Sequence, residues 1–150
     1  MYKNSFVHYL TKIAVDIMFY GGILCTLAVP FIMPWLAGYL DYSETVILPF
    51  TIILFLSGLC SVYILWQLKA IFRTLLGGNP FVGANINCLR KCSVASFLIA
   101  VIYLAKMTFW FTITTLIFVI VFSLLSLFCL TLKDVFKQAV AYKEENDGTV

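Results

Sequence analysis

Charged residues are scarce in this chain: Asp, Glu, Lys and Arg together make up 11% of its 150 residues. Hydrophobic residues make up 63%, and the mean hydropathy is +1.03. A water-soluble domain of this length cannot bury so much apolar surface. The composition therefore excludes a soluble globular protein and predicts an integral membrane protein.

Residues that carry enzyme chemistry are also rare. The chain has one histidine, His8, which precedes the first apolar segment, and it contains no Ser-His-Asp, HExxH or phosphate-binding glycine motif. No ionisable residue lies in the middle of an apolar segment, where ion-coupled transporters usually keep one. We therefore expect no catalytic residue, no cofactor and no metal site, and a protein that is not an enzyme.

Five cysteines are present, and none falls in the segments 40–44 and 106–111, which we predict to be the outer loops. No disulfide framework is indicated. Cys88 and Cys92 lie one helical turn apart beside basic residues, but a metal site would need two further ligands and none is nearby. We interpret the cysteines as free thiols that pack as small apolar residues in a reducing compartment.

Four segments are long and apolar enough to cross a bilayer, which takes about 20 residues. We predict an all-α fold, a four-transmembrane-helix bundle in one membrane domain, with spans at about 14–38, 45–68, 86–106 and 110–132. Pro30 and Pro34 are expected to kink or fray the first span. Lys106 falls in the last outer turn of the third span, where its long stem can reach the headgroups. The third and fourth spans then form an antiparallel hairpin.

Basic residues predict the orientation, because Lys and Arg in short loops stay on the cytoplasmic side. Only Lys106 lies at the outer side. Both termini are therefore expected in the cytoplasm, in a multi-pass protein of the bacterial cytoplasmic membrane. The first span is too long for a signal core and lacks a cleavage site, so we expect it to remain in the mature protein. The inner basic residues are Lys3, Lys12, Lys69, Arg73, Arg90, Lys91, Lys133, Lys137 and Lys143.

Two helices are predicted to continue into the cytoplasm. The second runs to Leu76, where Gly77 stops it and opens a turn over residues 77–84, and Asn85 is a reasonable cap for the next helix. The fourth continues through an apolar stripe that includes Phe136 into a tail at 133–150. The two extensions are placed to pack side by side.

Small residues four apart allow helices to approach closely, and they indicate contact faces within the bundle or between protomers of a homo-oligomer. The pairs are Gly21/Cys25, Ser57/Ser61 and Ser96/Ala100. Asp16 can pair with Lys12, one turn earlier on the same helix.

Aromatic residues make up 17% of the chain, and several gather toward the outer side. One interpretation is an aromatic belt at the membrane interface. The other is an outward-facing apolar crevice for a hydrophobic ligand or peptide. The residues that would line this crevice are Trp35, Tyr39, Tyr103 and Trp110.

Two motifs connect the chain to a known family. One is Gly78-x-Pro80-Phe81 followed by Asn85, Leu89 and Arg90, and the other is Phe136-x-x-Ala139 leading to Lys143-Glu144-Glu145-Asn146-Asp147 and ending Thr149-Val150. At these residues the chain resembles domain-of-unknown-function family 2975, a family of small bacterial membrane proteins with four spans. It departs from the family at Gly148, where a bulky apolar residue is expected. The resemblance implies genes that lie beside those of small helix-turn-helix regulators.

These observations favour a non-enzymatic membrane regulator or sensor in signal transduction. It would bind a small cytoplasmic helix-turn-helix transcription regulator and make no direct contact with nucleic acid. The alternative is a bacteriocin-immunity or small transport-type protein that acts through the bundle itself. The residues expected to bind the partner on the cytoplasmic face are Arg73, Asn79, Pro80, Phe81, Asn85, Arg90, Phe136, Lys137, Glu144, Glu145, Asn146 and Asp147.

Overall fold

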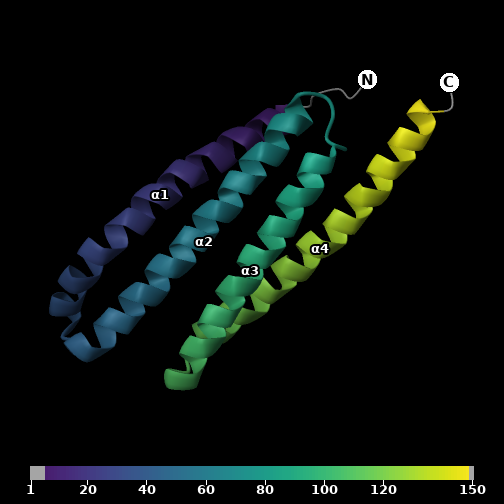
Figure 1. The fold of residues 1–150 in the computed structure, drawn as a ribbon. Helices are drawn as coiled ribbons and strands as arrows, with labels where there is room; N and C mark the ends of the chain where they lie inside the picture. Colours follow the sequence, from purple (N-terminus) through teal and green to yellow (C-terminus); the bar gives the residue numbers. More distant parts are fainter. Residues whose placement is uncertain (1–5, 149–150) are drawn as a thin grey trace.

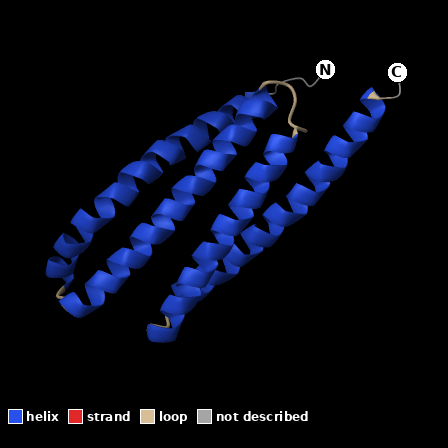
Figure 2. Ribbon diagram, viewed as in Figure 1, coloured by secondary structure: helices blue, strands red, loops and turns tan. Residues whose placement is uncertain are grey.

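The computed structural model describes residues 6–148, which form four α-helices joined by short turns (Figures 1 and 2). All four helices are long and apolar enough to span a membrane, which confirms an all-α, multi-pass membrane protein. Lys3, used above for the orientation, and Thr149 and Val150 of the tail motif lie outside the described residues. The helices are α1 (Phe6–Leu40), α2 (Glu44–Leu76), α3 (Gly83–Phe109) and α4 (Ile113–Asp147).

The helices alternate in direction, so the molecule has two distinct ends (Figure 1). One end carries the start of α1, the α2–α3 turn and the close of α4, and we call it the termini end. The other carries the α1–α2 and α3–α4 turns, and we call it the hairpin end. Helices of 33 to 35 residues are roughly 50 Å long at about 1.5 Å per residue. That length exceeds a hydrocarbon layer of about 30 Å.

The helices pack in chain order: α1 on α2, α2 on α3, and α3 on α4. Among the described residues, the backbone of α4 approaches neither α1 nor α2, and Figure 1 shows an open layer rather than a closed bundle. The predicted bundle is wrong in this respect, as is the prediction that the extensions of α2 and α4 pack side by side. Lipid solvates an apolar helix face as well as another helix does, so no hydrophobic force closes the layer.

α1 is one unbroken helix that continues through Pro30 and Pro34 to Leu40, and it is bowed in Figure 1. α2 ends at Leu76 in a Schellman motif. The N–H of Asn79 donates to the carbonyl of Thr74 at 3.3 Å, and the N–H of Gly78 donates to that of Leu75 at 3.2 Å. Gly78 takes the left-handed conformation that this motif requires, with φ +85°. Gly77 keeps a right-handed φ of −70°.

Small buried residues carry the helix contacts, with α3 at the centre. Ser96 and Ala100 are buried on α3, as the sequence predicted for a contact face. Ser93 and Ser126 join α3 to α4: their hydroxyl oxygens lie 3.1 Å apart, and Ser126 Oγ donates to the Ser93 carbonyl at 3.0 Å. The buried residues of α3 are Asn85, Leu89, Cys92, Ser93, Ala95, Ser96, Ile99 and Ala100.

Within one copy of the chain the contact face predicted for α1 is not used, and a contact between protomers there stays a prediction. Gly21 and Cys25 are exposed, and a side chain at Gly21 would meet no atom within 4 Å. The neighbouring positions face α2 instead. Thr26 is buried there against Gly58, because α1 and α2 approach most closely where one of them lacks a side chain. All five cysteines carry free thiols.

We predict that Gly58→Ala destabilises the protein by about 1 to 3 kcal/mol, the usual cost of overpacking. A Cβ at this position would lie 2.7 Å from Thr26 Oγ1 and 3.0 Å from its Cγ2. The threonine side chain is stiff, and its hydroxyl donates to the Gly22 carbonyl at 2.7 Å. The measurement is the free energy of unfolding in an SDS titration.

Two variants control this experiment. Thr26→Ala removes both clashing atoms, so the cost of Gly58→Ala should largely disappear in the double variant. Gly21→Ala places the same methyl group on α1 where no atom lies within 4 Å, and it should be neutral or slightly stabilising. Equal destabilisation by Gly21→Ala and Gly58→Ala would contradict the close approach at Thr26.

Candidate functional site

A side-chain amide holds the α2–α3 turn at the termini end. Asn85 Nδ2 donates to Thr74 Oγ1 at 2.7 Å and to the Pro80 carbonyl at 2.6 Å, and Asn85 is only 1% exposed. The residue that caps α3 is Val82, which offers no side-chain hydrogen bond. The predicted capping role of Asn85 is therefore wrong: the residue ties the end of α2 to the turn and to the first turn of α3.

The turn also contacts α4. The rings of Phe81 and Phe136 meet edge to face, with centroids 5.5 Å apart and an interplanar angle of 68°. Lys143 Nζ donates to Asn79 Oδ1 at 2.7 Å. The two sequence motifs that carry the family resemblance thus meet in space, although α3 separates them along the chain. We call this region the turn–α4 surface, and it consists of Asn79, Phe81, Phe136, Lys137, Lys143, Glu144, Glu145, Asn146 and Asp147.

The residues predicted to bind a partner fall into three groups. Those of the turn–α4 surface are exposed, apart from half-buried Phe136. Pro80 and Asn85 are buried in the turn, so they shape the surface without being accessible on it. Arg73 and Arg90 are exposed but lie elsewhere at the termini end, each in a different groove between helices.

An ion pair joins α1 to α2 near the same end. Lys69 Nζ lies 3.0 Å from Asp16 Oδ1, and it also sits over the rings of Phe19 and Tyr20 at 4.6 and 4.7 Å from their centroids. Asp16 therefore pairs across the helix interface rather than with Lys12 on its own helix. The sequence could not show this, because the partner lies on another helix.

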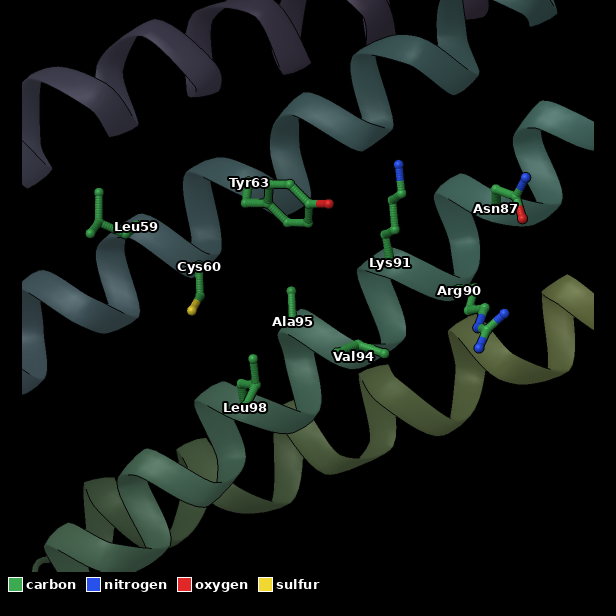
Figure 3. A pocket seen from close by; sticks show the side chains of 9 residues that line it. All are labelled: Leu59, Cys60, Tyr63, Asn87, Arg90, Lys91, Val94, Ala95 and Leu98. Carbon is green, nitrogen blue, oxygen red and sulfur yellow. The ribbon is translucent and has the colours of Figure 1, made fainter.

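A groove of about 560 Å³ runs between α2 and α3 (Figure 3). Tyr63 from α2 and Lys91 from α3 extend into the space between the two helices (Figure 3). The sequence does not predict this groove: Lys91 serves there only as an orientation marker, and Arg90 is also expected to bind a partner. A signal was present, since Asn87, Lys91, Val94 and Leu98 follow one face of α3 at three- and four-residue spacing. The groove is lined by Leu59, Cys60, Tyr63, Asn87, Arg90, Lys91, Val94, Ala95 and Leu98.

Lys106 turns inward at the hairpin end. It lies in the last turn of α3, where its Nζ donates to Thr115 Oγ1 of α4 at 2.9 Å and sits 4.4 Å from the ring centroid of Phe50 of α2. Thr115 is only 1% exposed. The amine therefore links three helices, and its contact with the headgroups stays a prediction.

An apolar cavity of about 490 Å³ also lies at the hairpin end, between α1, α2 and the α3–α4 turn. Among the four aromatic residues predicted to line an outer crevice, Trp110 lines this cavity. Trp35 and Tyr39 stack on each other and are 71% and 80% exposed. Tyr103 lies elsewhere, with its hydroxyl 3.3 Å from Ser57 Oγ and its ring 5.2 Å from that of Phe118.

One comparison with known proteins identifies a family for this chain. Residues 16–150 match the profile of the family described as "Protein of unknown function (DUF2975)". The chain belongs to this family. Searches of the curated proteins and of the solved structures gave no significant match. The match covers α2, α3 and α4 completely, and it begins at Asp16, the residue that pairs with Lys69.

We predict that Asn85→Ala destabilises the protein by about 1 to 3 kcal/mol, because it leaves the buried Pro80 carbonyl and Thr74 hydroxyl without the amide donor. The free energy of unfolding is the measurement. Asn87→Ala is the matched control: it removes the same amide two residues later, where the side chain is exposed, and the expected change is within about 0.5 kcal/mol. Equal effects of the two variants would show that the Asn85 amide does not hold the turn.

Proposed function

We propose that the protein lies in the bacterial cytoplasmic membrane with both termini in the cytoplasm. Among residues 6–148, every Lys and Arg except Lys106 lies toward the termini end. This asymmetry supports the orientation, because short cytoplasmic loops are enriched in basic residues. The start of α1, the α2–α3 turn and the close of α4 then face the cytoplasm.

The orientation predicts the activity of reporter fusions. Green fluorescent protein at the carboxy terminus should fluoresce, because it folds in the cytoplasm. Alkaline phosphatase inserted in the α1–α2 turn at residues 41–43 should be active, because it needs an oxidising compartment for its disulfides. The exchanged fusions should be inactive, and the reverse pattern would place the termini outside.

We infer further that the protein is a non-enzymatic membrane regulator whose turn–α4 surface binds a small cytoplasmic transcription regulator. The observation that carries this proposal is the junction of the two family motifs through Phe81–Phe136 and Asn79–Lys143. These contacts order an exposed surface beyond the membrane-spanning part of α4. A frayed tail would not need such contacts.

The acidic residues near the close of α4 support a partner with a basic surface. The last turns of α4 carry Glu144, Glu145 and Asp147, all exposed, beyond the basic Lys137 and Lys143. An acidic tip of this kind attracts a protein with a basic face, such as a DNA-binding domain. The family resemblance implies a helix-turn-helix regulator encoded nearby, and the regulator rather than this chain would contact DNA.

α4 offers a route from the membrane to this surface. The apolar cavity at the hairpin end is lined by Thr112, which caps the start of α4. α4 then continues as one helix to the turn–α4 surface at Asp147. A hydrophobic ligand in the cavity would contact one end of the helix whose other end binds the regulator. In this proposal the ligand changes the position of α4 on α3, and the regulator is held or released.

The test is co-purification from gentle detergent with the neighbouring helix-turn-helix regulator. Full-length protein should retain it, and a chain that stops after Val140 should lose it. That truncation removes the acidic tip but keeps the Phe81–Phe136 contact. Combined Glu144→Gln and Asp147→Asn should weaken retention, more strongly at low salt.

Combined Asp41→Asn and Glu44→Gln is the matched control, because it removes the same charge from the hairpin end and should change nothing. Failure of the full-length protein to retain any DNA-binding protein would refute the proposal.

The alternative function, bacteriocin immunity or small-molecule transport, is favoured by the apolar hairpin-end cavity. Protection of cells against a membrane-active peptide by the chain that stops after Val140 would support that alternative.

A further inference from the structure

We propose that the α2–α3 groove binds an anionic phospholipid, with the phosphate at Arg90 and Lys91 and one acyl chain along the apolar part of the groove. The site is distinct from the turn–α4 surface and does not depend on the function proposed for it. It requires only that the helices span a membrane.

The groove changes character along its length. Asn87, Arg90 and Lys91 lie at the part nearer the termini end, and Leu98 lies toward the hairpin end (Figure 3). On α2, Tyr63 faces the polar part, while Leu59 lies one turn further toward the hairpin end (Figure 3). A polar head followed by an apolar tail is the pattern of a phospholipid. The cavity volume of about 560 Å³ is also in the range of small-molecule sites.

Arg90 and Lys91 form no ion pair within residues 6–148. Among the described residues, the ion pairs are Lys69–Asp16 and Lys133–Asp134, and neither Arg90 nor Lys91 takes part in one. Both residues line the groove, although in Figure 3 the side chain of Lys91 extends toward α2 and that of Arg90 lies on the α4 side of α3. Two unpaired cations beside apolar surface favour an anion from outside the chain. A phosphate group suits them, because guanidinium offers paired donors and ammonium a point charge.

The depth of the cations matches that of lipid phosphates. Counting back from Phe109 at the hairpin end of α3, about 20 residues at 1.5 Å each span a hydrocarbon layer of roughly 30 Å. That count reaches Arg90. Arg90 and Lys91 therefore lie at the boundary where phosphates begin, and basic pockets between transmembrane helices at this level bind anionic headgroups.

A second copy of the chain fits the groove less well. Near this level the described acidic residues are Asp16 and Asp134, and both are paired within the chain. Glu144, Glu145 and Asp147 lie in the last turns of α4, about 15 to 20 Å along that helix from Asp134 at 1.5 Å per residue. Within residues 6–148, a partner protomer would therefore bring no unpaired carboxylate to the level of Arg90 and Lys91.

The experiment is native mass spectrometry of the full-length, delipidated protein in detergent, titrated with phosphatidylglycerol or with phosphatidylcholine of the same chains. Phosphatidylglycerol should bind more tightly. Combined Arg90→Gln and Lys91→Gln should weaken its binding by about fivefold per basic residue, hence roughly twenty- to thirtyfold. The charge-preserving pair Arg90→Lys and Lys91→Arg should retain most of the affinity.

The control for charge is combined Arg73→Gln and Lys137→Gln, which removes two cations from the same end but none from this groove. It should leave phosphatidylglycerol binding within about twofold. Val94→Trp fills the apolar part of the groove while staying hydrophobic, and it should weaken binding although both cations remain. Size-exclusion elution and the unfolding midpoint show that each variant is folded.

Four outcomes would overturn the proposal: equal binding of the two lipids, equal loss in the groove and control variants, unchanged binding by Val94→Trp, or displacement of the lipid by millimolar inorganic phosphate. The last would indicate a site for a free anion. A protein that binds no phosphatidylglycerol but forms dimers cross-linked through a cysteine introduced at Val94 would assign the groove to a second copy.

Discussion

The buried amide of Asn85 determines how the two helical hairpins of this protein are joined. α1 and α2 form one hairpin and α3 and α4 the other, and the connection between them passes through six residues. Asn85 bonds to Thr74 before this connection and to Pro80 within it. The same turn presents Phe81 and Asn79 to α4. The position of the exposed surface therefore depends on a side chain that is not accessible on it.

Polar interactions near the two ends complement the small-residue contacts between the helices. In a bilayer, an apolar side chain gains little free energy when it moves from lipid into a helix interface, so close packing and hydrogen bonds must hold the helices together. Asp16–Lys69 joins α1 to α2 toward the termini end, and Lys106 contacts both Thr115 and Phe50 at the hairpin end. Asp16, Lys69 and Lys106 thus act between helices near the two ends of the molecule.

The sequence predicted the elements well and their neighbours poorly, for one physical reason. Charge-free runs of sufficient length identify spans directly, because the cost of charges in hydrocarbon limits where helices cross. Contact faces leave a weaker pattern, since they differ from the lipid-facing sides only by small or polar residues such as Thr26 and Ser96. Gly21 and Gly22 are adjacent and identical, yet no atom lies within 4 Å of a Cβ at Gly21, while one at Gly22 would lie against Val62 and Leu65.

The same limit applies to the polar residues. The side chain of Asn85 suits a helix cap. Because Asn85 lies two residues after the start of α3, its amide bonds to the Pro80 carbonyl and holds the turn instead. The sequence predicts that Asp16 pairs with Lys12 on its own helix, but in the fold it pairs with Lys69 on α2. The motif residues of the turn and of α4 were recognised as a set, but only the three-dimensional arrangement brings Phe81 to Phe136.

The open layer gives α4 a special place in the proposed mechanism. Within the described part of the chain it packs along α3 alone, whereas α2 and α3 each have neighbours on both sides. A displacement of α4 is therefore resisted by its interface with α3, where the Ser93–Ser126 hydrogen bond is buried, and near its close by the contacts with the α2–α3 turn. The proposed lipid would lie against the other side of α3, between the two hairpins, and would fix α3 on α2. The lipid would then hold α3 in place while α4 moves along it. The hydrophobic ligand at Thr112 would therefore act on the interface between α3 and α4.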